Sequence, residues 1–147
     1  MTGIAIRPFQ PADSDAVLGL LRSSDLPVAD VVPGVLKDFV VAHCGPDIVG
    51  VAGIERHGDC GLLRSVSVDA QLRGTGLGRR LVEAMETCAR QHGIRCLYLL
   101  TTTADGFFAS QGYTPTARER APAAIQGTAE FSTLCPASSR FMMKTLQ

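Results

Sequence analysis

Apolar and polar positions in this chain alternate with a period of two in short stretches, and stretches with a helical period separate them. Alternation, or a short apolar run bounded by turn residues, is typical of strands, whereas apolar residues three and four apart indicate a helix. The pattern predicts strands over residues 4–8, 38–44, 48–57, 62–68, 94–101, 113–116 and 140–146. It predicts helices from residue 11 to the turn at 23–25, over 28–36, from the glycines at 74–78 to residue 91, and over 104–110. Two further helical turns are expected over 122–125 and 129–134.

Residue types at the ends of these stretches set the expected helix boundaries. Asp13 is a candidate N-cap for the first helix. Pro33 breaks or weakens a helix over 28–36, because proline lacks the backbone donor. The helix after the glycines ends at Gly93 and carries an apolar stripe that is expected to face the core. The stripe consists of Leu77, Leu81, Met85, Cys88 and Ala89.

The connections between the strands predict how they pair. Turn residues at 45–47 and 58–59 join three successive strands, which predicts an antiparallel meander over 38–68. The strand over 94–101 is reached through a helix, and such a crossover predicts that it lies parallel to the strand over 62–68. The predicted class is therefore α/β (α+β), with a mixed sheet in a single domain over residues 1–147.

Composition and charge limit the partners and the compartment. The chain has 147 residues with 14 Lys+Arg and 14 Asp+Glu, so its formal charge is zero. This balance argues against nucleic acid or an anionic membrane as the main partner. No apolar stretch has the pattern of a signal sequence or the length of a membrane span, so we expect a cytoplasmic protein. The five cysteines lack metal-ligand spacing and are expected to be reduced apolar residues, so no metal site is predicted.

Three glycines at alternate positions, Gly74, Gly76 and Gly78, follow the strand over 62–68. Glycine lets backbone N–H groups approach a ligand, and the first turn of a helix offers further unpaired N–H groups at the positive end of its dipole. Together they predict an anion site suited to a pyrophosphate. The spacing is neither the G-x-G-x-x-G of dinucleotide-binding folds nor a Walker loop. A glycine-rich turn that binds nothing is the alternative. The arginines beside the glycines are Arg73, Arg79 and Arg80.

The order Gln71-x-x-Gly74-x-Gly76 resembles the acetyl-coenzyme A (acetyl-CoA) signature of the GNAT acyltransferases. The order of elements resembles the GNAT fold over the whole chain, which implies a mixed sheet of about six to seven strands with helices on both faces. In that family the loop amides hold the coenzyme A pyrophosphate. The pantetheine arm enters where two parallel strands part, which here are 62–68 and 96–101. The resemblance implies cofactor-binding roles for Val66, Val68, Arg73, Gly74, Thr75, Gly76, Gly78, Arg79 and Phe108.

Three local stretches resemble narrower groups within that family. The stretches over 63–69 and 99–108 are similar to the matching segments of short bacterial glutamate N-acetyltransferases. The whole chain, including the tail over 129–136, looks most like the N-acetyltransferases linked to arsenic resistance. Both resemblances imply one kind of acceptor, because the arsenic-containing antibiotic arsinothricin is a glutamate analogue.

Arg64 is the candidate anchor for such an acceptor. It stands among apolar residues in the middle of a predicted strand, where a lone charge is costly unless it is paired. A guanidinium binds a carboxylate through two hydrogen bonds, and the resemblance implies that Arg64 holds a carboxylate of the substrate. The alternative is a structural ion pair with Asp59 or Glu55. Further candidates for the acceptor side are Ser65, Thr101 and Thr102.

Acetyl transfer to an amine requires a base for the amine proton and a source of a proton for the leaving thiolate. Glu55 and His57 share one face near the end of a predicted strand, and they are the first and second candidates for the base. A solvated strand end is the alternative for both. Many GNAT enzymes place a tyrosine as general acid where this chain has Phe108, which leaves water or Tyr113 for that role, and Tyr113 is also a packing candidate.

These features predict an N-acetyltransferase that moves acetyl from acetyl-CoA to the α-amine of a small glutamate-like amino acid by direct attack in a ternary complex. The expected partner is a small-molecule amine acceptor, with no nucleic acid and no membrane, and a homodimer is an assembly common in the family. Two alternatives remain open. One is a GNAT enzyme for another small amine, and the other is a non-catalytic module that binds coenzyme A or a metalloid.

Overall fold

Seven strands form a mixed sheet in the order β1-β2-β3-β4-β5-β7-β6 in the computed structural model, which describes residues 3–24, 26, 28, 29, 31, 36–135 and 138–146. Neighbouring strands are antiparallel except β4 and β5, which are parallel. The predicted meander and the parallel crossover are therefore confirmed. The strands are β1 (Ile4–Pro8), β2 (Phe39–Cys44), β3 (Asp47–His57), β4 (Cys60–Val68), β5 (Cys96–Thr101), β6 (Thr114–Pro115) and β7 (Arg140–Thr145).

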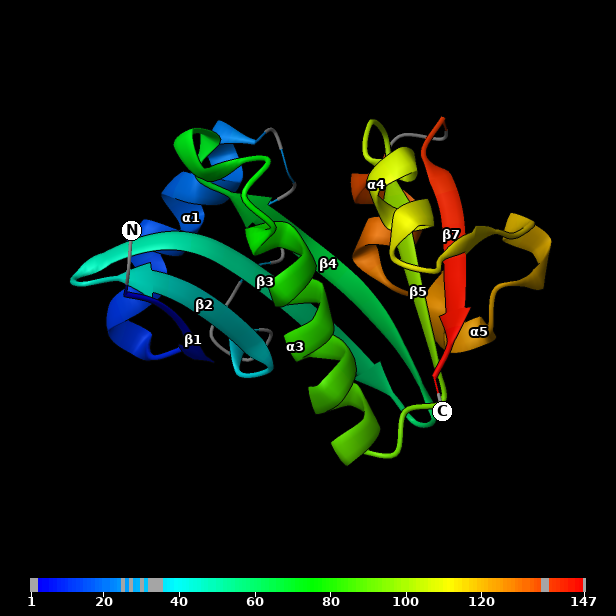
Figure 1. Cartoon of the computed structure of the whole chain (residues 1–147). Coiled ribbons are helices and arrows are strands. Elements are labelled where there is room, and N and C mark those ends of the chain that lie inside the picture. Colours follow the sequence, from blue (N-terminus) through cyan, green and yellow to red (C-terminus); the bar gives the residue numbers. More distant parts are fainter. Residues whose placement is uncertain are drawn as a thin grey trace.

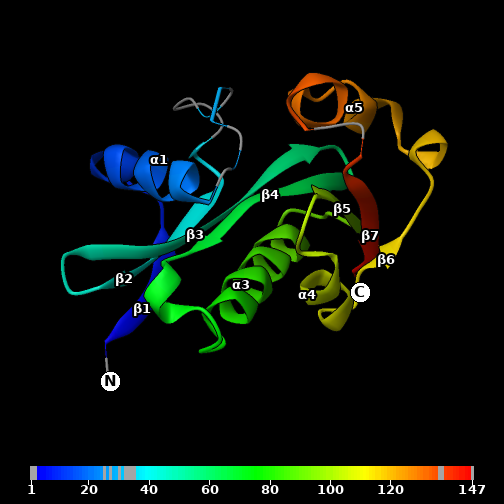
Figure 2. The same ribbon diagram turned by 90° about the horizontal axis from the view of Figure 1, so that it is seen from above.

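Helices cover both faces of this sheet, as predicted. Helices α3 and α4 lie on one face, while α1 and α5 lie on the other (Figures 1 and 2). The chain passes through 3₁₀ turns before α1, before α3 and before α5, and a π-helix, η4, follows α5. The helices are α1 (Ser14–Ser23), α3 (Leu77–Gln91), α4 (Asp105–Ser110), α5 (Ala123–Gln126) and η4 (Glu130–Leu134). The expected helix over 28–36 lies mostly outside the described residues.

Three buried clusters hold these layers together. The largest packs α3 against one face of the sheet, and it contains Leu63, Leu81, Met85 and Leu97. A second cluster packs α1 against β2 and β3 on the other face, and a third lies beneath α5. The third cluster contains Cys60 and Leu62 of β4 together with Ile125 and Phe141. Burial of apolar side chains on both faces explains why the strands of the centre read as nearly continuous apolar runs.

Several sequence predictions need correction in detail. Asp13 is the N-cap residue of α1 as predicted, but its carboxylate makes no capping hydrogen bond to the helix, because it binds the Arg7 guanidinium at 2.7 Å and accepts from the Gln10 N–H at 2.8 Å. The strand predicted over 113–116 is reduced to β6, since the Tyr113 N–H donates to the Phe108 carbonyl at the end of α4. Cys88 is only half-buried.

Candidate active site

The parallel strands β4 and β5 part in the middle of the sheet. They pair only where residues 60–62 meet residues 96–98, whereas β4 continues to Val68 and β5 to Thr101. Beyond the paired part, β4 stays with β3 and β5 stays with β7, and the two strands diverge in Figure 1. The predicted splay is confirmed.

A β-bulge interrupts β4 where it leaves β5. Val51 pairs with Ser67 and Gly53 pairs with Arg64, so two residues of β4, Ser65 and Val66, oppose one residue of β3. Ser65 has φ of 59°, a left-handed conformation that is uncommon outside glycine. A bulge inserts one residue and so exchanges the faces of the side chains that follow. Accordingly Val66 packs against the α3 cluster, while Arg64 and Ser65 face the opposite side with Glu55 and η4.

The glycine-rich loop precedes α3 as predicted. Gly74 and Gly76 have φ of 80° and 88°, and a side chain at either position would meet no atom within 4 Å. Gly76 is the N-cap of α3, so the first N–H groups of the helix point out of the loop beside it. Glycine is favoured at position 78 for a different reason, namely close packing, because a Cβ there would lie 3.3 Å from the Phe107 ring. The loop thus combines positive φ, open space and a helix N-terminus at the end of β4.

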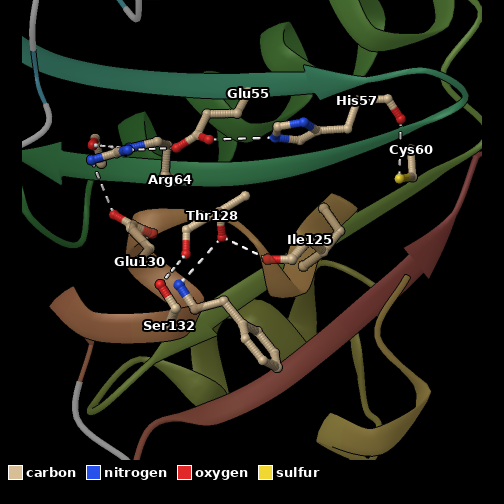
Figure 3. Close-up of polar contacts among 10 residues, drawn as sticks. Glu55, His57, Cys60, Arg64, Ile125, Thr128, Glu130 and Ser132 are labelled. Carbon is tan, nitrogen blue, oxygen red and sulfur yellow. Dashed lines mark hydrogen bonds and ion pairs between the residues drawn. The ribbon is translucent and has the colours of Figure 1, made fainter. Parts of the chain in front are cut away.

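Glu55, His57, Arg64, Ser65 and Glu130 form a linked group that we call the Arg64 cluster. The Arg64 side chain is 0% exposed, and its Nη1 lies 2.6 Å from Glu55 Oε2. Its Nε donates to the Ser65 hydroxyl at 3.2 Å, and its Nη2 lies 3.2 Å from Glu130 Oε2. The other oxygen of Glu55 lies 3.4 Å from His57 Nε2. Figure 3 shows Glu55 between the histidine and the arginine. The ion pair with Glu55, one of the two alternatives for Arg64, is present.

Glu130 comes from the π-helix η4, where the sequence predicted a helical turn over 129–134. Its side chain is 5% exposed and points at the guanidinium from the side opposite β3 (Figure 3). Sequence reasoning missed it as a site residue. The available signal was indirect: a buried arginine requires carboxylate partners, and Glu130 is the only acid between residues 120 and 147.

Two of the predicted acceptor residues, Thr101 and Thr102, lie at and after the end of β5. The Thr101 hydroxyl accepts a hydrogen bond from the Ala104 N–H at 3.0 Å, before α4 begins, and Thr102 is exposed. Among the described residues, no hydrogen bond links either threonine to the Arg64 cluster. Phe108 is 7% exposed and lies in the core, in edge contact with Phe107 and Tyr113. Their substrate- and cofactor-binding roles stay predictions.

Tyr113 is a packed residue rather than an open proton donor. It is 1% exposed, and its hydroxyl donates to Glu86 at 3.0 Å. Burial, followed by the charge of Glu86, raises the pKa of this phenol well above its usual range. Lys144 binds the same carboxylate at 3.0 Å. The Tyr113 hydroxyl therefore belongs to a buried hydrogen-bonded group with Glu86 of α3 and Lys144 of β7.

Neither a metal centre nor a membrane span is found in the part of the chain that the structure describes. No group of three or more His, Cys, Asp or Glu side chains there is arranged to hold a metal ion. No helix within the described ranges combines the length and the apolar character needed to cross a bilayer.

Comparison with known sequences finds acetyltransferases. A family model described as an acetyltransferase (GNAT) domain matches residues 36–115, which is more than half of the chain. An amino-acid acetyltransferase from Pseudomonas fluorescens (strain Pf0-1) is 39% identical over 97 residues, covering 65% of this chain and 22% of that relative. The chain therefore spans about a fifth of the length of this curated relative.

Comparison with solved structures finds the same fold. N-acetylglutamate synthase from Neisseria gonorrhoeae, complexed with coenzyme A and N-acetyl-glutamate, matches with a TM-score of 0.86 at 19% identity, over 100% of this chain and 36% of that one. Rv2747 from Mycobacterium tuberculosis, in complex with CoA and NLQ, matches with a TM-score of 0.84 at 22% identity. That match covers 97% of this chain and 99% of that one, so the neighbour has a similar extent.

Proposed function

This chain belongs to the acetyltransferase (GNAT) domain family, and we propose that it transfers acetyl from acetyl-CoA to the α-amine of a small glutamate-like amino acid. The observation that carries the proposal is the coincidence of two features at the parting of β4 and β5. One is the glycine loop at the end of β4, and the other is a buried guanidinium, Arg64, on the opposite face of the same strand.

The proposed coenzyme A site lies on the α3 side of β4. The N–H groups of the loop and of the first turn of α3 hold the pyrophosphate, with Arg73, Thr75 and Arg79 beside it. The pantetheine arm follows β4 past Val66 and Val68. A backbone N–H near Val66 polarises the thioester carbonyl as negative charge develops on its oxygen. Arg79 is 68% exposed and pairs only on the surface with Glu83, which leaves it able to turn toward a phosphate.

Replacing Gly76 with alanine should weaken acetyl-CoA binding specifically. A side chain at φ of 88° is strained, so the loop relaxes away from the conformation that directs its N–H groups. We expect the KM for acetyl-CoA to rise about tenfold, since a loss of about 1.4 kcal/mol corresponds to a factor of ten. Steady-state release of the coenzyme A thiol measures it. Gly19→Ala in α1, where φ is helical and the space is open, is the control and should leave both KM values unchanged.

The proposed chemistry is direct attack of a neutral amine on the thioester. Glu55 takes the proton of the acceptor ammonium, directly or through a water, and His57 at 3.4 Å offers a route for that proton to solvent. The amine nitrogen then forms the C–N bond, the C–S bond breaks, and the second proton of the nitrogen leaves to water. Because Phe108 has no proton to give and the Tyr113 hydroxyl is bound to Glu86, water protonates the thiolate. Binding both substrates together supplies rate through proximity.

A panel of acceptors tests the proposal. Thiol release from acetyl-CoA is measured with glutamate, arsinothricin, phosphinothricin and the other proteinogenic amino acids. Arsinothricin is included because the sequence resembles arsenic-resistance acetyltransferases. Release that depends on one of the glutamate-shaped acceptors supports the proposal. Release with a different amine contradicts the acceptor class, and silence across the panel, with coenzyme A bound, contradicts turnover of amino acids.

A further inference from the structure

Glu130 stands where a substrate carboxylate would bind Arg64. Its Oε2 lies 3.2 Å from Nη2, on the Nη2 edge of the guanidinium, whereas Glu55 Oε2 lies 2.6 Å from Nη1. Glu130 is itself a glutamate side chain, so the site already accommodates the carboxylate and methylenes of a glutamate-like group. With Arg64 0% and Glu130 5% exposed, no acceptor reaches this edge while Glu130 stays in place.

The charges of the Arg64 cluster define what can enter it. One guanidinium and two carboxylates give a formal charge of −1. Adding an acceptor carboxylate with Glu130 in place would put three carboxylates around one buried cation, which is costly in a poorly solvated site. Exchanging Glu130 for the acceptor carboxylate leaves the formal charge unchanged and keeps the guanidinium paired.

The backbone around Glu130 is held independently of its carboxylate. The Phe131 ring packs on Phe141 at 5.4 Å and lies 5.4 Å from the Arg118 guanidinium. The Thr128 hydroxyl donates to the Ile125 carbonyl at 2.7 Å (Figure 3). It also accepts from the Phe131 N–H at 3.3 Å. These contacts anchor η4 on the side of β7, so the exchange moves the Glu130 side chain while the backbone of η4 stays in place.

We propose that Glu130 is a specificity-determining residue, a resident carboxylate that occupies Arg64 and is displaced by the carboxylate of an acidic acceptor. This inference rests on the proposed function. Glu130 keeps the buried guanidinium paired when the acceptor is absent. It also disfavours amines without a carboxylate, because they offer Arg64 nothing in exchange and leave Glu130 in their way. Glu130 also lowers the affinity for acidic acceptors, since each of them must replace the existing ion pair between Glu130 and Arg64.

Glu130→Gln tests the exchange. The amide keeps an oxygen for Arg64 but loses the charge, so it competes less with a carboxylate. We expect the KM for glutamate to fall about tenfold, with kcat and the KM for acetyl-CoA unchanged. Glu119→Gln removes the same charge from an exposed position in the 3₁₀ turn before α5 and should change none of these values. Glu130→Asp keeps the charge but shortens the reach, and it should also lower the KM for glutamate, which covers the case that the glutamine variant does not fold.

The outcomes separate this inference from the proposed function. A KM for glutamate that rises or stays unchanged in a folded Glu130 variant overturns the exchange, because Glu130 would then bind the acceptor or serve only to pair Arg64. A wild-type chain that acetylates no carboxylate-bearing amine contradicts the proposed function instead. Calorimetric titration of glutamate into the coenzyme A-loaded protein gives a second reading of the same change, and it should show tighter binding to Glu130→Gln than to the wild type.

Discussion

Glu55→Gln is expected to lower kcat for acetylation of glutamate by about a hundredfold or more, with the KM for acetyl-CoA unchanged. Glutamine has nearly the same shape and keeps an oxygen for the Arg64 guanidinium, which lies 2.6 Å from Oε2 in the wild type. It cannot accept the proton of the acceptor ammonium. The loss should therefore appear in the chemical step, and single-turnover measurements with saturating substrates will show it directly.

A matched carboxylate-to-amide exchange provides the control. Asp38 accepts from Arg56 at 3.0 Å in an exposed ion pair outside the Arg64 cluster, and Asp38→Asn should leave kcat unchanged. If Glu55→Gln keeps its kcat while His57→Gln loses it, the base is His57, the second candidate. If neither variant changes kcat, proton removal by this pair is wrong and the amine reacts without help from either side chain.

Arg64→Ala should raise the KM for glutamate about a hundredfold and also lower the free energy of unfolding by about 3–5 kcal/mol. Alanine removes the anchor for the acceptor and leaves the carboxylates of Glu55 and Glu130 without the cation that now lies 2.6 and 3.2 Å from them. The KM for acetyl-CoA should not change, since the glycine loop lies on the other side of β4. Denaturant titration and steady-state kinetics at low temperature measure the two effects separately.

Arg56→Ala is the control for this change. Arg56 is 36% exposed and paired with Asp38, so its loss should cost no more than about 1 kcal/mol and leave both KM values unchanged. Arg64→Lys retains the charge but not the planar fork, and it should recover stability more than acceptor binding. Equal losses of acetyl-CoA and acceptor affinity in Arg64→Ala would contradict an anchoring role.

Local patterns were sufficient for much of the fold. The apolar runs within 48–57 and over 62–68 predicted β3 and most of β4, because a strand that is buried on both faces carries apolar side chains at nearly every position. The helix before β5 predicted the parallel pair, since parallel neighbours need a crossover. The three glycines before this helix predicted the position of the glycine-rich loop at the N-terminus of α3.

The geometry of the candidate active site depends on contacts between residues far apart in the sequence, which a local sequence pattern does not reveal. A period of two would place Arg64 and Val66 on the same face of β4, yet the bulge at Ser65 turns Val66 toward α3. A bulge is decided by how β4 pairs with β3 and by the space around it, and serine carries no strong preference for φ of 59°. This single inserted residue separates the proposed acetyl-CoA face from the Arg64 face.

The sequence by itself determined the order of elements, the glycine loop and the presence of an arginine that must be paired within a buried strand. Only the tertiary structure decided which acids pair with it. Glu55 is a diagonal neighbour across the β3–β4 ladder and is close by register, whereas Glu130 arrives from η4 after the chain has crossed β5 and α4. Periodicity reports the environment of a residue but not the identity of its distant neighbours. Packing of Phe131 on β7 places the neighbouring Glu130 beside Arg64. The carboxylate and the guanidinium then pair, because both are buried and a single buried charge is costly.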